Sequence, residues 1–178
     1  MMRRLVGGLA LVGLWLVGAA TVPGAELQRR MTGHFRVAES DGVLQQRLAA
    51  AIDHAVEPMN FVARPIARSR LRSVVYYCKE YEMALGPETV RVACDERPRI
   101  ERRLDNSEGL VAGLQSEPVD VKVSVGGDTV ELRIEGSDGT RVTTYRFDDG
   151  GALEVDVKVI SPRLERPVTW KVLYRRDG

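Results

Sequence analysis

From Val119 to the end of the chain, apolar and polar residues alternate with a period of two. The first stretch, "VDVKVSV", places every valine on one side of an extended chain and the polar residues on the other. Because successive side chains of a strand point to opposite faces, this stretch predicts a β-strand with one apolar and one solvated face. The sequence predicts five such strands in succession, with apolar sides at residues 119–125, 130–134, 143–147, 153–159 and 168–174.

Short turns rich in glycine separate these predicted strands. The turns "GGD", "SDG" and "DDGG" supply residues that adopt positive φ angles easily, as tight hairpins require. A two-residue loop at 138–139 pairs Leu132 with Tyr145 and Glu131 with Arg146. In this register all large apolar side chains of both strands lie on one face, whereas a shift by one residue would mix the faces.

An antiparallel sheet with one apolar face either packs against another layer or closes on itself. The predicted helices offer little apolar area beside five strands, so closure is the better solution. A hairpin through "LGPET", between Cys78 and Cys94, and a strand near Phe35 would complete the barrel. The predicted fold class is therefore mainly β: an up-and-down antiparallel barrel, or a strongly curved meander sheet, with a short N-terminal helix pair.

The helix pair is predicted at about residues 41–72. Ser40 or Asp41 can cap the first helix, because a short oxygen-bearing side chain accepts hydrogen bonds from the free amides of a first turn. Pro58 ends this helix, and Pro65 stands near the start of a short second one. The first helix is amphipathic, with apolar residues at every fourth position: Leu44, Leu48, Ile52 and Val56.

Arginines 64, 68 and 72 recur at every fourth position of the second predicted helix, so that one helix face is basic. Two interpretations remain open for Arg64, Arg68 and Arg72. They form either an ordinary solvated face or a surface that contacts anionic lipid headgroups or an acidic partner.

The N-terminus has the three parts of a secretory signal peptide. The basic "MMRR" precedes an uncharged apolar stretch at Leu5–Val17, and "GAATVPGA" offers small residues for cleavage between Ala20 and Ala25. We predict a signal peptide at residues 1–25 and a single mature domain at residues 26–178, exported to the periplasm or the extracellular space. A retained membrane span is the alternative, although the apolar stretch is short for one.

Export bears on the chain's two cysteines, Cys78 and Cys94, because an oxidising compartment lets a disulfide persist. They lie on either side of the predicted hairpin turn, so their sulfurs can meet across two strands. The alternatives are a redox pair or a metal site. Against these, the cysteines form no CxxC motif, and His34 and His54 have no metal-ligand spacing to them.

One strand, a helix pair and a long meander ending in "VTWKVLYRR" resemble the calycin plan, specifically that of the fatty-acid-binding proteins, in which two helices sit over the barrel mouth. The stretches "AIDHAVEPMNFVARPIARSRL" and "VKVISPRLERPVTWKVLYRR" are also similar to a group of exported bacterial proteins without an assigned function. The first resemblance implies a lipid-like ligand. Animal fatty-acid-binding proteins hold the ligand carboxylate with an Arg-x-Tyr pair in the last strand, but the matching residues here are Val172, Leu173 and Tyr174.

The residue inventory does not favour catalysis, cofactor binding or nucleic-acid binding. His34 and His54 have no nucleophile beside them in the predicted elements, and most acidic residues of the strands fall on solvated positions. Removing the two arginines of "MMRR" from the 26 basic residues leaves 24 against 25 acidic ones. This balance gives no electrostatic reason to expect a nucleic acid.

Two functional hypotheses therefore remain, both of them non-enzymatic. In the first, the barrel holds a small apolar or lipid-like ligand. In the second, the same side chains fill the interior, and the protein is an interaction or structural module of the cell envelope. The alternation of apolar and polar residues fits both hypotheses. Barrel width decides whether the interior is filled or hollow, and this width depends on strand number and shear. The candidate lumen or mouth residues are Met59, Phe61, Tyr145, Phe147, Trp170 and Tyr174.

Overall fold

The computed structural model describes residues 23–107, 111–112 and 118–177. Most of the predicted signal peptide at residues 1–25 lies outside the described residues. The described helices are α1 (Ala25–Met31), α2 (Asp41–Val56) and α3 (Ala63–Val74). The strands are β1 (Gly33–Val37), β2 (Glu80–Leu85), β3 (Thr89–Cys94), β4 (Ile100–Arg103), β5 (Val111–Ala112), β6 (Pro118–Gly126), β7 (Thr129–Gly136), β8 (Gly139–Phe147), β9 (Leu153–Ile160) and β10 (Val168–Arg176).

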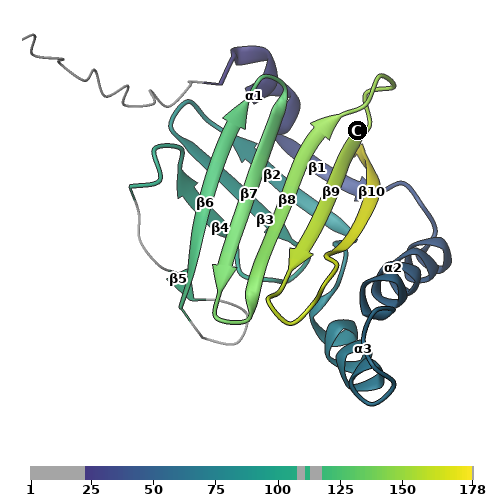
Figure 1. Cartoon of the computed structure of the whole chain (residues 1–178). Helices are drawn as coiled ribbons and strands as arrows, with labels where there is room; N and C mark the ends of the chain where they lie inside the picture. Colours follow the sequence, from purple (N-terminus) through teal and green to yellow (C-terminus); the bar gives the residue numbers. More distant parts are fainter. Residues whose placement is uncertain (1–22, 108–110, 113–117, 178) are drawn as a thin grey trace, which may run out of the picture.

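The strands form one antiparallel sheet in the order β4-β3-β2-β1-β10-β9-β8-β7-β6-β5. Figure 1 shows this sheet curled into a barrel, with β6 to β10 in front of β1 to β4. The predicted mainly β fold, with its meander and its helix pair between the first two strands, is confirmed. The short helix α1 and the strands β4 and β5 were not predicted, because these elements are too short to show a periodic pattern of apolar residues.

An asparagine side chain joins the two ends of the sheet. No ladder is described between β4 and β6, but Asn106 follows β4 and reaches across the opening. Its Nδ2 donates to the Val123 carbonyl over 2.9 Å, and its Oδ1 accepts from the Val123 amide over 2.7 Å. Asn106 has a φ of 54°, which asparagine tolerates better than most residues. One side chain thus replaces a strand pair at the seam of the barrel.

The predicted register of the β7–β8 hairpin is wrong by two residues. The loop consists of residues 137–138, and Gly139 pairs with Gly136 as the first residue of β8. A Cβ at Gly139 would lie 2.2 Å from the main-chain oxygen of Ile160, so only glycine lets β9 approach here. Consequently Leu132 lies opposite Thr143, and Glu131 lies opposite Thr144 rather than Arg146.

Arg146 instead pairs across the strand with Glu154 of β9, and it also lies 3.0 Å from a carboxylate oxygen of Asp156. The division into inner and outer faces survives the correction, because a shift by two residues preserves the alternation. Leu132 and Tyr145 are both buried, as predicted.

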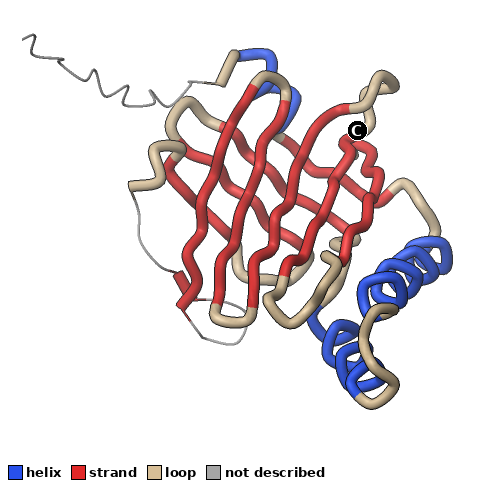
Figure 2. Tube along the Cα trace, in the orientation of Figure 1, coloured by secondary structure: helices blue, strands red, loops and turns tan. Residues whose placement is uncertain are grey.

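The helices occupy opposite ends of the barrel (Figure 2). At one end, α1 buries Leu27 and Met31. At the other end, which we call the helix-pair end, α2 lies beside β10 and α3 packs against α2. The apolar face of α2 joins the core, and Arg47 donates to the main-chain oxygen of Lys171 over 2.6 Å. Arg47 also lowers the pKa of Glu39 by hydrogen bonding, so the charged pair anchors α2 to the barrel.

A disulfide joins Cys78, just before β2, to Cys94 at the end of β3, with the two Cα atoms 5.4 Å apart. This confirms the predicted pairing across the β2–β3 hairpin. Among the described residues, no helix is long and apolar enough to cross a membrane.

Candidate binding site

The barrel interior contains a cluster of three tyrosines, Tyr81, Tyr145 and Tyr174. The ring centroid of Tyr81 lies 5.6 Å from that of Tyr145 and 5.0 Å from that of Tyr174, with edge-on geometry in both cases. Burial raises the pKa of Tyr81 to about 12, and it also raises the pKa of the other two. The hydroxyls are therefore neutral near pH 7, and that of Tyr174 donates to the Cys78 carbonyl over 2.8 Å.

Side chains pack the interior closely. Every buried residue on the inner faces of β6 to β10 exposes 5% or less of its surface, including Trp170 at 5% and Val168 at 0%. A water-sized space beside these side chains would make them accessible, so no such space adjoins them. Other inner-face residues of the same strands, such as Val125, Ile134 and Val159, are partly exposed.

An arginine and two aromatic side chains meet at the helix-pair end of the barrel. Arg141 of β8 occupies an inward position, opposite Ile134 and Val159. Its guanidinium lies 4.2 Å from the ring centroid of Tyr76 and 5.5 Å from that of Trp170. These cation–π contacts hold a positive charge against apolar surfaces at the mouth of the barrel.

Two hydrogen-bond donors at this mouth are buried and have no acceptor among the described residues: Arg141 Nη1 and Trp170 Nε1. No described carboxylate forms an ion pair with Arg141. A buried donor without an acceptor costs roughly 1–3 kcal/mol, and more when it is charged. Each of these donors could therefore accommodate an anionic oxygen atom supplied from outside the chain.

A second arginine, Arg97, lies 3.6 Å from the ring centroid of Tyr76. Tyr76 belongs to the connection between α3 and β2 rather than to the sheet, and it lies against the mouth of the barrel. We call Tyr76, Arg97, Arg141 and Trp170 the mouth cluster.

The six candidate residues from the sequence lie in three different places. Tyr145, Trp170 and Tyr174 are inside the barrel. Phe147 lies toward α1, with its ring centroid 6.1 Å from that of Phe35 and 4.3 Å from the guanidinium of Arg30. The other two belong to the connection after α2: Met59 packs partly against the core, and Phe61 is 87% exposed.

Sequence reasoning missed Arg141, although a signal for it was present. The alternation that places Thr143, Tyr145 and Phe147 on the inner face also places Arg141 there. A charged residue at an inward strand position is unusual enough to mark a site. For Tyr76 and Arg97, which lie outside regular strands, no periodic pattern exists.

Two of the three arginines at every fourth position of α3 contact α2 rather than solvent alone. Arg68 forms an ion pair with Asp53 at 2.7 Å, and Arg64 Nη2 donates to the Glu57 carbonyl over 2.7 Å. These residues border a shallow groove between the helices. Arg72 is exposed. The predicted basic stripe is therefore partly a connection between the two helices.

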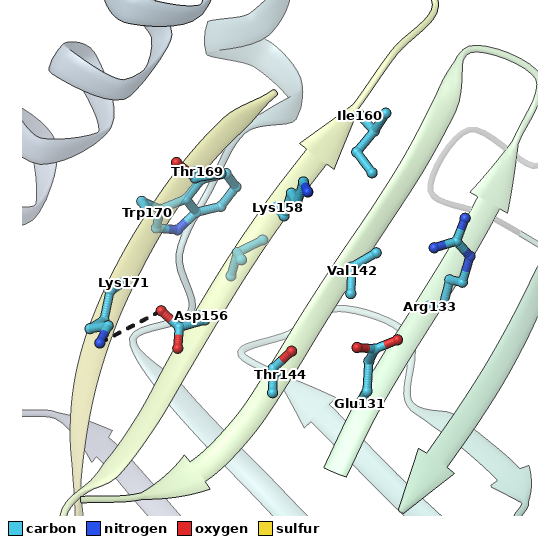
Figure 3. Close-up of a pocket in the computed structure, with 11 residues that line it drawn as sticks. Glu131, Arg133, Val142, Thr144, Asp156, Lys158, Ile160, Thr169, Trp170 and Lys171 are labelled. Carbon is cyan, nitrogen blue, oxygen red and sulfur yellow. Dashed lines mark ion pairs between the residues drawn. The ribbon is translucent and has the colours of Figure 1, made fainter. Parts of the chain in front are cut away.

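The outer face of β7 to β10 carries a groove of about 620 Å³ (Figure 3). Its lining side chains, including Glu131, Lys158 and Lys171, come mainly from outward strand positions. Lys171 Nζ lies 2.8 Å from Glu154 and 3.8 Å from Asp156. Because acidic and basic groups neutralise one another across this face, the groove has no single-sign field that would select an ionic ligand.

Solved structures identify the architecture. The REP1-NXSQ fatty acid transporter matches with a TM-score of 0.51 and 12% identity, over 84% of this chain and 98% of that one. The chain has the fold of the fatty-acid-binding proteins. The apo form of Caenorhabditis elegans lipid binding protein 8 also matches, with a TM-score of 0.51 and 10% identity over 84% of this chain and 96% of that one. No family model and no curated protein matches the sequence.

Proposed function

We propose that this protein is an exported, non-enzymatic binding protein that holds a small apolar molecule with one anionic group at the helix-pair end of its barrel. The observation that carries this proposal is the pair of buried donors without acceptors, Arg141 Nη1 and Trp170 Nε1. A carboxylate accepts strong, charge-assisted hydrogen bonds from such donors. The names of the similar structures, a fatty acid transporter and a lipid binding protein, support the same class of ligand.

Access to this site requires one side chain to leave, because the interior is packed. Tyr76 is the best placed to do so, since it lies in a connection and can move without breaking a strand ladder. Its departure would free one face of the Arg141 guanidinium and open the space beside Trp170. In this account, the ring of Tyr76 closes the mouth of the barrel in the structure.

Export is the second part of the proposal. The N-terminal "MMRR", apolar stretch and small residues support a cleaved signal peptide. The disulfide between Cys78 and Cys94 is compatible with an oxidising compartment.

Arg141→Gln tests the ligand site, with dodecanoate as the probe in a calorimetric titration. A hydrogen bond to a charged group contributes about 1.5–3 kcal/mol, so we expect binding to weaken about 10- to 100-fold. Trp170→Phe, which removes the uncharged Nε1 donor together with part of the ring, is expected to weaken it less.

Arg133→Gln is the matched control, because Arg133 is half-buried on the outward face of the neighbouring strand β7. It should bind dodecanoate as the unchanged protein does. Equal affinity of the Arg141 and Arg133 variants would exclude the mouth cluster as the anion site.

The packed interior itself favours a second candidate function, an interaction module of the cell envelope with a ligand-free barrel. This alternative predicts no binding of dodecanoate by any of these proteins, and no dependence of partner binding on Arg141.

A further inference from the structure

Three large apolar side chains are strongly exposed at the tip of the helix pair. Phe61 is 87% exposed, Val62 59% and Ile66 55%. They lie within six consecutive residues, at the connection between α2 and α3 and in the first turn of α3. A cluster of this kind is uncommon on a soluble surface, where exposed apolar residues are usually scattered.

The chain holds this tip in a defined conformation. Asn60 Oδ1 accepts hydrogen bonds from the amides of Val62 and Ala63, over 3.1 and 2.9 Å. Arg64 donates to the carbonyl groups of Glu57 and Met59, at the end of α2 and just beyond it. The exposed side chains therefore project from a braced turn rather than from a loose loop.

Positive charge predominates on the helix that follows the tip. The helix α3 contains four arginines and no acidic residue. Arg64 and Arg68 are engaged with α2, but Arg70 and Arg72 are exposed and have no acidic partner among the described residues. Val62, Ile66 and Arg70 follow one another at every fourth position, so apolar and basic groups share one helix face.

We infer that this tip docks on the surface of a bilayer that contains anionic lipid, with Phe61, Val62 and Ile66 entering the headgroup region and Arg70 and Arg72 contacting phosphate groups. Apolar insertion combined with anionic attraction is the physical basis of interfacial helix binding. The inference goes beyond the proposed function, because it needs no ligand in the barrel. Of the predicted Arg64, Arg68 and Arg72 stripe, this contact surface keeps Arg72 alone.

The test is sedimentation of the mature protein with vesicles of phosphatidylcholine alone or with added phosphatidylglycerol. We expect binding to the anionic vesicles at low salt, weakening as salt rises. Replacing the apolar tip in the triple variant Phe61→Ser, Val62→Ser, Ile66→Ser should weaken binding at least about tenfold. In the double variant Arg70→Gln, Arg72→Gln, vesicle affinity should fall about fivefold per arginine, and most of its salt dependence should disappear.

The controls replace exposed apolar and basic residues elsewhere on the surface. The double variant Val43→Ser, Ile160→Ser removes apolar surface away from the tip. The double variant Arg163→Gln, Arg175→Gln removes positive charge away from the tip. Both should sediment like the unchanged protein. All replaced positions are exposed, so the denaturation midpoint of each variant should stay close to that of the unchanged protein. Measuring this midpoint checks that each variant is folded.

Two results would overturn the inference. One is equal sedimentation of the unchanged protein and the apolar-tip variant, including the absence of binding by either. The other is a dimer of the unchanged protein that the apolar-tip variant converts to a monomer, because the tip would then be a contact between copies of this chain.

Discussion

Leu132→Asp is expected to lower the free energy of unfolding by about 3 kcal/mol or more, enough to unfold a marginally stable domain. Leu132 is 3% exposed on the inner face of β7, and the residues directly opposite it, Val123 on β6 and Thr143 on β8, carry no charge to balance the new carboxylate. The measurement is chemical denaturation followed by circular dichroism.

Glu131→Gln is the matched control, one residue away and on the outer face. Glu131 lies opposite Thr144 and forms no ion pair among the described residues, so the change should cost less than about 1 kcal/mol. Comparable losses in the two variants would mean that the inner and outer faces of β7 are wrongly assigned.

The double variant Cys78→Ala, Cys94→Ala should lose about 2–4 kcal/mol of stability. The disulfide closes a loop with a sequence separation of 16, and removing such a link enlarges the conformational freedom of the unfolded chain. Cys78 is also 1% exposed, so truncation of its side chain adds a small packing loss.

A reducing agent supplies the control for this second change. It should lower the denaturation midpoint of the unchanged protein toward that of the double variant and leave the variant's own midpoint unaltered. A midpoint of the unchanged protein that does not respond to reduction would show that the two cysteines are not linked in solution.

The fold could be predicted largely from the alternation of apolar and polar residues. Within each strand, every second side chain faces inward, and this holds whichever residues are paired across the hairpin. Leu132 and Tyr145 were assigned correctly although their pairing was not. The register itself was decided by Gly139, which admits the main-chain oxygen of Ile160. That approach is a tertiary contact, so no local pattern of turn residues could indicate it.

The site could be predicted only in part, because aromatic content does not show where side chains gather. Tyr145 and Tyr174 were assigned to the interior, but Phe61 lies on the surface. The mouth cluster depends on Tyr76 and Arg97, which the chain brings to Arg141 from connections outside the strands. Loop residues of this kind carry no period, and only the three-dimensional path of the chain places them.

The central claim, that the barrel holds an anionic apolar molecule, is tested most directly by native mass spectrometry of the protein purified gently from its own cell envelope. The account predicts a bound species of constant mass that is released on denaturation and is absent from Arg141→Gln purified in the same way. The same measurement shows whether residues 1–25 have been removed. Repeated isolation of the bare chain, or an adduct that the Arg141 variant retains, would contradict the account and favour the ligand-free envelope module.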